Sequence, residues 1–330
     1  MLDVTIHADR VQIGRHFSVS FERTLRIPDD GRDYPLPPSV GQFPVRRVAD
    51  YADRVPAAWR EHGGVFLPMY QREAMWLNFR GAHWRPNAIK VAVGKVNALS
   101  GERYHQRLEG TREDYVVVPP QPWLDGINAG NGFIRQFVAM PLGMGYTVEG
   151  QVTGEERHGG LQIVCFDPKP GRFPDQPPPP PARARAEAFD GMVAPAPAAA
   201  AAGGAEMGLA AGGRMRQHLY PDPHGLDTWD QANYGRVFVH IVNSQLWREI
   251  TGEPFPPTPV DARAYTNAGL PWFELYDDQL GDIPASDVLA NVKSVAHKDA
   301  QHGFTGQQDD TPLHTPNVKP LGNSVPDGKW

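Results

Sequence analysis

The sequence predicts an α+β protein dominated by β structure, with antiparallel or mixed sheets in a sandwich-like arrangement and a few short helices, mainly in the C-terminal part. Two observations predict this class. Glycine and proline each occur 34 times in 330 residues, which is above ordinary usage and typical of a chain with many turns. Apolar residues also recur with a period of two in several segments, as they do in strands. At 40% apolar residues, the chain is long enough to bury a substantial core.

Alternation predicts one-sided strands at 17–27 and 87–99, and a strand, loop and strand at 114–143 with a turn around 126–132. Two further strands are expected at 146–154 and 159–168. In the second of these, Leu161, Ile163 and Cys165 share one face, and Gln162, Val164 and Phe166 share the other. Segment 71–77 contains helix formers, but its strand-like neighbours favour a strand over 74–79. A single helix is expected within 50–64, with Pro56 in its first turn and two glycines at its end.

The second half has a mixed pattern that predicts two strands and three helices. Strands are expected at 213–221 and 236–242, and a short helix follows at 243–252 with Asn243 or Ser244 as its N-cap. A helix is expected at 258–269, with Thr258 as its N-cap and Pro259 at the first position. Segment 285–298 is expected to be one amphipathic helix, with Val288, Leu289, Val292 and Val295 on one face.

These patterns divide the chain into a β-rich part (1–173), a disordered Pro/Ala-rich excursion (174–207), an α+β part (208–296) and a polar tail (297–330) that is expected to be disordered. Two strands alone are marginal without partners. We therefore expect residues 208–296 to pack on the first part as one fold, although the alternative of a linker between two domains stays open.

The net charge of -6 is mild, and lysine and arginine are scattered along the chain, which argues against a nucleic-acid partner. The sequence contains no apolar run of the length that a membrane span needs, and its start does not resemble a secretory signal. We therefore expect a cytoplasmic protein that is not associated with a membrane. The single cysteine excludes an intramolecular disulfide and a multi-cysteine zinc site.

The candidate catalytic residues are His158 with Glu155 or Glu156 as acid–base groups, and Cys165 as a nucleophile. Cys165 is expected to be a buried strand residue, and the acidic segment around His158 also has the composition of a solvated turn. Four residues within 222–230 carry oxygen or nitrogen atoms that could bind a hard cation. Their spacing differs from that of an EF-hand loop, and the same residues are also common in ordinary turns. These residues are Asp222, His224, Asp227 and Asp230. We expect no metal and no cofactor.

Aromatic and amide side chains form the most suggestive group, because they would line a groove for a sugar or peptide if the strands bring them together. The candidate ligand-binding residues are Tyr70, Gln71, Trp76, Gln121, Trp123, Asp125, Arg135 and Gln136. The alternative is that Trp76 and Trp123 belong to the core.

Three functions follow from these observations. The sequence contains no established catalytic motif, and its five-proline run is able to dock on a partner as polyproline II. The first expectation is therefore a non-enzymatic β-rich structural or interaction protein with a protein partner or a self-associating homo-oligomer. The alternatives are a carbohydrate or small-ligand binding module that uses the aromatic and amide residues, and a hydrolase that uses His158 with Glu155 or Glu156.

Overall fold

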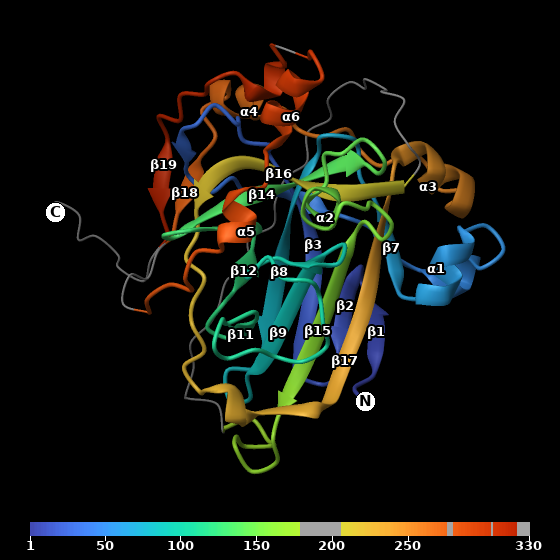
Figure 1. The fold of residues 1–330 in the computed structure, drawn as a ribbon, viewed down its shortest axis with the longest axis vertical. Coiled ribbons are helices and arrows are strands. Elements are labelled where there is room, and N and C mark those ends of the chain that lie inside the picture. The colour runs from blue at the N-terminus through green and yellow to red at the C-terminus, as the bar shows by residue number, and fades with distance from the viewer. Residues whose placement is uncertain (179–205, 276–279, 305, 322–330) are drawn as a thin grey trace, which may run out of the picture.

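The computed structural model describes residues 1–178, 206–275, 280–304 and 306–321. Within these residues strands dominate and the helices are short (Figure 1), which confirms the predicted fold class. Most of the predicted excursion (174–207) and the last nine residues lie outside the described part of the chain.

The strands are β1 (Val4–His7), β2 (Arg10–Ile13), β3 (Phe17–Thr24), β4 (Asp33–Tyr34), β5 (Ser39–Gln42), β6 (Arg46–Arg47), β7 (Val65–Pro68), β8 (Ala74–Gly81), β9 (Asn87–Val93), β10 (Val96–Asn97), β11 (Val116–Val118), β12 (Trp123–Leu124), β13 (Gly126–Gly130), β14 (Phe133–Pro141), β15 (Leu161–Pro168), β16 (Glu206–Arg216), β17 (Trp229–Val242), β18 (Trp272–Glu274) and β19 (Val318–Pro320). The α-helices are α1 (Ala57–His62), α2 (Val148–Thr153), α3 (Ser244–Thr251), α4 (Ala262–Asn267), α5 (Asp287–Ala290) and α6 (Val295–Gln301). Three 3₁₀-helices complete the set: η1 (Val48–Tyr51), η2 (Leu226–Thr228) and η3 (Gln308–Asp310).

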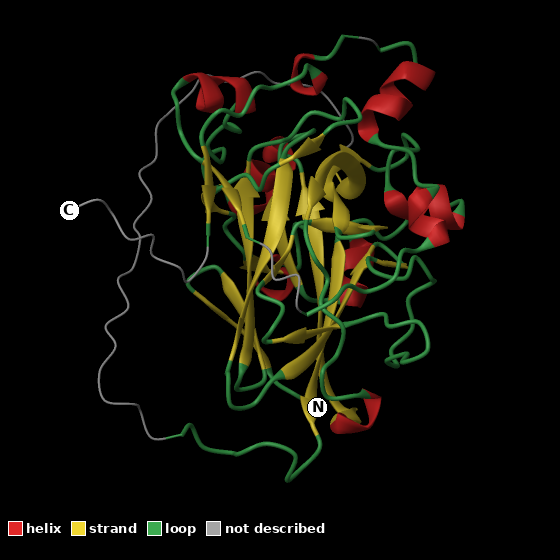
Figure 2. Cartoon of the chain, turned by 90° about the vertical axis from the view of Figure 1, so that its left-hand side faces the viewer, coloured by secondary structure: helices red, strands yellow, loops and turns green. Residues whose placement is uncertain are grey.

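The main sheet folds into two facing layers. In one layer β9, β15 and β17 are antiparallel neighbours, and in the other β2, β3 and β8 are antiparallel neighbours. Strand β14 pairs with both β8 and β16, and the β14–β16 pair crosses the upper end of the vertical strands (Figure 1). Figure 2 shows the strands in the middle of the molecule, with the helices at its periphery.

Strands that precede residues 179–205 are hydrogen-bonded to strands that follow them. β15 pairs with β17, and β14 pairs with β16, both antiparallel. Two parallel pairings, β7 with β17 and β4 with β16, make the sheet mixed. The two parts of the chain therefore share one sheet.

The largest apolar cluster fills the space between the two layers. It takes Val19 and Phe21 from β3, Val91 from β9, and Ile163 and Cys165 from β15. Since side chains alternate along a strand, the other face of β15 contributes Val164 and Phe166 to a second cluster on the outside of the sheet. The two faces predicted for this strand are confirmed, and both are covered.

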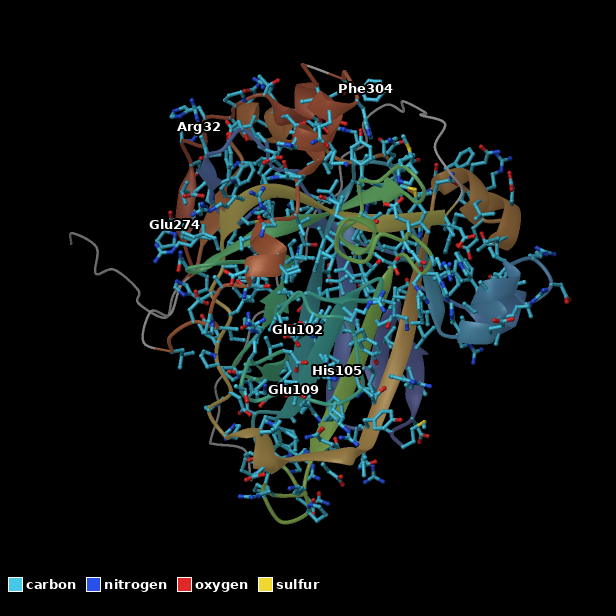
Figure 3. All side chains as sticks on the ribbon, in the orientation of Figure 1. Arg32, Glu102, His105, Glu109, Glu274 and Phe304 are labelled. Carbon is cyan, nitrogen blue, oxygen red and sulfur yellow. The ribbon has the colours of Figure 1, made fainter. Side chains whose placement is uncertain are left out.

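The outer cluster is covered by the loop between β10 and β11. Leu108 and Tyr115 of this loop pack on Phe166 and Trp229. Figure 3 shows Glu102, His105 and Glu109 of the same loop over the sheet. Beneath them, the ammonium group of Lys90 donates to the backbone oxygen of Arg107.

The predicted strand at 146–154 is wrong, because these residues form α2. The Thr147 hydroxyl accepts from the Gly150 amide 3.0 Å away, and Gly154 ends the helix in the left-handed conformation. The N-cap and the C-terminal glycine therefore favour a helix over the strand that the period-two pattern predicted. In the first half, the helix expected within 50–64 is shortened to α1, preceded by η1. The strand expected over 74–79 is β8.

Three predicted boundaries in the second half also change. The strand predicted at 213–221 is β16, which already begins at Glu206. The helix predicted from Thr258 is α4 and begins only at Ala262, because Asp261 is the N-cap and its carboxylate accepts from the Ala264 amide. The helix predicted over 285–298 is divided into α5 and α6, each with its own serine cap, Ser286 and Ser294. By contrast, the Asn243 cap of α3 is confirmed.

The described part of the polar tail contains regular structure that its composition did not indicate. α6 extends to Gln301, and β19 pairs with β18 in a small parallel sheet. Backbone pairing with an ordered strand therefore holds a segment with few apolar side chains. No helix within the described residues has the length and apolar composition that crossing a bilayer requires.

Candidate functional site

A pocket of about 280 Å³ lies where four distant parts of the chain meet: the residues after β3, the turn before β8, the start of α4 and the segment around η3. The polar side chains that line it are those of Arg26, Gln71, Arg72, Glu73, Asp261, Arg263, Asp309 and Thr311. The pocket therefore combines cationic, anionic and amide groups, and two of its charged residues, Arg26 and Glu73, are buried.

Glu73 is fixed at the base of the pocket by three hydrogen bonds. Its Oε1 accepts from Nε of Arg23 at 2.7 Å and also from Nη2 of Arg23, and its Oε2 accepts from the Tyr70 amide at 2.8 Å. Burial raises the pKa of Glu73 above its ordinary value, although Arg23 opposes this shift. The paired carboxylate and guanidinium form a rigid support beside the pocket.

Arg26 is the most buried cation of the pocket, with only 7% of its surface exposed. Burial and the nearby Arg72 lower the pKa of Arg26 to about 10, so it keeps its charge at neutral pH. It forms ion pairs with Asp309 and Asp310, the second at 2.7 Å. Within the described residues its Nε–H has no hydrogen-bond partner.

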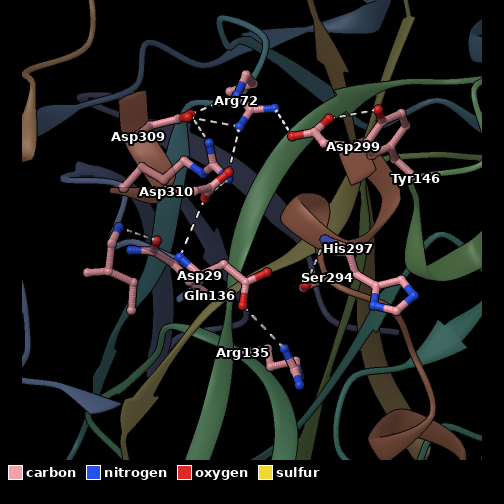
Figure 4. A network of polar contacts seen from close by, with 12 residues as sticks. Asp29, Arg72, Arg135, Gln136, Tyr146, Ser294, His297, Asp299, Asp309 and Asp310 are labelled. Atoms are coloured by element: carbon pink, nitrogen blue, oxygen red, sulfur yellow. Dashed lines mark hydrogen bonds and ion pairs between the residues drawn. The ribbon is translucent and has the colours of Figure 1, made fainter. Parts of the chain in front are cut away.

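Arg72 joins the two sides of the site (Figure 4). Its Nη1 donates to Asp299 at 2.6 Å, its Nε donates to Asp309 at 2.7 Å, and its Nη2 contacts Asp310 at 3.1 Å. Asp299 also accepts from the Tyr146 hydroxyl at 2.8 Å. One guanidinium therefore holds α6 and η3 against the turn before β8.

The backbone of Arg72 has a left-handed conformation, with φ of 70°. This region costs an L-residue other than glycine about 1 kcal/mol. The amide of Arg72 donates to the Ala139 carbonyl at 2.7 Å, so pairing with β14 holds the turn in this shape. Such strain occurs often at functional positions, and here it accompanies the side chain that makes the most ion pairs in the site.

The predicted ligand-binding residues are not gathered in one groove, and only Gln71 lines the pocket. The Tyr70 hydroxyl donates to the Pro256 carbonyl, and Arg135 lies 3.7 Å from Asp29 beside the network in Figure 4. Gln136 is fully buried, where its amide accepts from the Ile27 amide and donates to the Leu25 carbonyl.

Three other members of that group lie around β12. Gln121 donates to the Trp123 carbonyl and accepts from the Tyr220 amide, and Trp123 packs against the main core. Burial raises the pKa of Asp125 to about 7. Trp76 lies on β8, and its indole N–H is buried without a partner in the described part of the chain.

The predicted catalytic residues are also arranged differently from the pattern in the sequence. Nδ1 of His158 lies 2.8 Å from Oε1 of Glu149, a buried residue of α2. Glu155 pairs with Arg157 at 3.1 Å, and Glu156 accepts from the Thr147 amide and hydroxyl. The structure therefore places a carboxylate that the sequence analysis did not consider beside the histidine.

Cys165 has no exposed surface, and burial raises the pKa of its thiol well above the ordinary value. Since the thiolate is the nucleophilic form, this environment is that of a structural cysteine.

The predicted cation donors serve local structure. Asp222 accepts from the Tyr115 hydroxyl at 2.7 Å and from the Trp229 indole at 2.8 Å, and His224 packs its ring against Trp229. Asp230 accepts from the Ala232 amide at the start of β17, and Asp227 is exposed in η2. Among the described residues, no three histidine, cysteine or acidic side chains form a group that would hold a metal ion.

The sequence does not single out Arg26, Arg72, Asp309 and Asp310, because single arginines and an Asp-Asp pair in a polar segment carry no recognisable local pattern. The fold and the pocket define a two-layered, β-dominated protein with a buried arginine site closed by acidic side chains. No protein-family model matches the chain, and neither the curated proteins nor the solved structures include one that is similar to it.

Proposed function

We propose that this protein is a non-enzymatic binding protein and that the pocket beside Arg26 binds a small ligand through an anionic group. This is the small-ligand alternative of the sequence analysis, placed at a different set of residues. The observation that carries the proposal is a buried, charged guanidinium that lines a pocket of about 280 Å³.

The chemistry of the lining supports an anionic ligand. Guanidinium groups bind carboxylates and phosphates through two parallel N–H donors, and such charge-assisted hydrogen bonds are among the strongest in proteins. Arg263 adds a third guanidinium, and its hydrogen bonds to the carbonyls of Thr311 and Pro312 are long, at 3.4 Å. Asp261 and Gln71 supply polar groups that would orient the rest of the ligand.

The test is a titration of the purified full-length chain with inorganic phosphate, sulfate and acetate, followed by melting temperature and calorimetry. We expect saturable binding of at least one probe at millimolar concentration, weakened at least fivefold in Arg263→Gln and abolished in Arg26→Gln. The matched control is Arg47→Gln, which removes the same charge from an exposed residue outside the pocket. Binding that persists unchanged in both pocket variants, or no saturable binding of any probe, would overturn the proposal.

Protein interaction and self-association remain predictions. The proline run that motivated them lies largely outside the described residues. Size-exclusion chromatography with light scattering, on the full chain and on a variant that lacks residues 179–205, tests them directly. If the full chain and the shortened variant both have the mass of a monomer, self-association is contradicted.

A second candidate function follows from the His158–Glu149 contact at 2.8 Å. A carboxylate that accepts from Nδ1–H of an imidazole leaves Nε2 to take a proton from water or a hydroxyl, as in a general base. We propose weak ester hydrolysis as the activity to test, with nitrophenyl esters as substrates. Loss of turnover in His158→Gln and retention in Glu155→Gln would support it, while equal turnover in both variants would exclude it.

A further inference from the structure

We infer that Asp309 and Asp310 are a tethered competitor that occupies the Arg26–Arg72 site, and that the ligand of this site is a small dicarboxylate. The inference rests on the proposed function and deepens it by naming the ligand class. The acidic segment is defined here as residues 306–313.

The first observation is that two carboxylates are shared by two guanidinium groups. Arg26 contacts both Asp309 and Asp310, and Arg72 contacts the same two residues at 2.7 and 3.1 Å. Each of the two carboxylates therefore contacts both guanidinium groups. The paired arrangement is the one that two linked acid groups would adopt on this surface (Figure 4).

The second observation is that this internal occupant fits incompletely. Nη2 of Arg26 donates to Asp310 at 2.7 Å, and Nη1 contacts Asp309 as an ion pair. Within the described residues, the buried Nε and Nη1 both lack a hydrogen-bond partner. A buried donor without an acceptor has lost its hydrogen bonds to water without replacement, which is unfavourable. A ligand that is free to rotate can place one carboxylate oxygen on Nε and the other on a terminal nitrogen, a two-point contact that the backbone-tethered aspartates do not make.

The third observation concerns charge. Four aspartates face three arginines in the network, so the site carries an excess of negative charge while the acidic segment is in place. The aspartates are Asp29, Asp299, Asp309 and Asp310, and the arginines are Arg26, Arg72 and Arg135. When the segment moves away, two aspartates face the same three arginines. The excess becomes positive, and the opened site attracts an anion.

The fourth observation is that the acidic segment is held at both ends, and that among its residues Leu313, near the C-terminal end, packs against the main core. α6 precedes it, and β19 follows it in a paired strand. Away from the two aspartates, the Leu313 amide donates to the Tyr34 hydroxyl at 3.2 Å, and Arg263 reaches two carbonyls of the segment at 3.4 Å. The segment is therefore able to lift from the arginines as a loop while its ends stay attached.

The pocket provides the route for exchange. Arg26, Arg72 and Asp309 all line it, so a ligand inside the pocket lies beside the ion pairs that it must replace. If only a fraction of the molecules have the acidic segment displaced, the apparent affinity for the ligand is the intrinsic affinity multiplied by that fraction.

The experiment compares wild type with the double variant Asp309→Asn, Asp310→Asn, using glutarate as the dicarboxylate probe and butyrate as its single-acid control. We expect the double variant to bind glutarate at least tenfold more tightly than wild type does, and to bind glutarate at least tenfold more tightly than butyrate. Adding Arg26→Gln to the double variant should abolish the gain. If the double variant does not fold, Asp310→Asn alone replaces it.

A second measurement uses wild type only. Ligand binding ordinarily slows amide hydrogen exchange. If glutarate displaces the acidic segment, we expect saturating glutarate to make exchange faster in residues 309–313 and slower in residues 71–73.

The outcomes separate the two proposals. No binding of any anion to either form is a failure of the proposed function. Equal affinity of both forms for glutarate, with no faster exchange in the acidic segment, leaves the proposed function intact and overturns the competitor. Equal affinity of the double variant for glutarate and butyrate overturns the dicarboxylate class.

Discussion

Nζ of Lys90 on β9 lies 2.5 Å from Oδ2 of Asp114, which belongs to the loop that covers the outer face of the sheet, and both side chains are buried. A buried pair adds little net stability, but removal of one partner leaves a buried charge without compensation. Lys90→Met should therefore lower the free energy of unfolding by about 3–5 kcal/mol. Urea denaturation measures the change.

The double variant Lys90→Met, Asp114→Asn is the matched control for that pair, because it removes both charges. It should recover at least half of the loss. A single variant within about 1 kcal/mol of wild type would show that the ammonium group does not hold the loop.

His240 should make the protein sensitive to acid. Burial is the main reason that the pKa of His240 falls to about 3 in the folded chain, whereas an unfolded histidine has a pKa of about 6.5. Between these values the unfolded state binds more protons, so stability is lost as the pH falls from about 6.5 toward 3, by up to about 1.4 kcal/mol per pH unit.

His240→Phe tests this linkage, because the ring is stacked between Trp59 and Phe238 and phenylalanine keeps the stacking. The variant should lose less stability than wild type between pH 6.5 and pH 4, as measured by urea unfolding at each pH. Parallel profiles for the two proteins would contradict the assignment.

Asp125 should lower the stability of the protein as the pH rises, which is the opposite of the effect of His240. Burial raises the pKa of Asp125 to about 7, above its unfolded value of about 4. The folded state therefore binds the extra proton, and stability decreases as the pH rises from about 4 to about 7. Asp125→Asn removes this titration, so the stability of the variant relative to wild type should rise across the same interval. A constant difference between the two proteins would refute the shift.

Gly160 and Gly171 form a matched pair for backbone packing, since both have a positive φ, of 54° and 78°. A Cβ at position 160 would lie 2.1 Å from the Val239 carbonyl oxygen, whereas a Cβ at position 171 meets nothing within 4 Å. Gly171→Ala should cost about 1 kcal/mol from the left-handed backbone, and Gly160→Ala should cost at least about 2 kcal/mol more because strands β15 and β17 must separate. Thermal melts of both variants decide this, and equal losses would contradict the close approach.

The sequence alone determined the local features of this protein. Period-two alternation identified the strands and the two apolar faces of β15, because side chains of a strand necessarily point to opposite sides. Glycine, proline and short polar side chains marked many of the turns and the cap of α3, because these residues act through backbone bonds within a few positions. The predictions from local sequence were wrong where an N-cap residue outweighed the pattern of the neighbouring side chains. Thr147 caps α2 in a segment predicted as a strand, and Asp261 caps α4 three residues after the predicted cap.

Only the tertiary structure decided the site. Arg26 and Asp310 are 284 positions apart, and Arg72 and Asp299 are 227 apart. An ion pair depends on distance in space, and no local pattern of residues encodes which arginine a distant aspartate will meet. The same reason explains why His158 has Glu149 as its partner in the fold, and why a polar tail that cannot order itself alone contributes η3 and β19 once the arginines and β18 are in place.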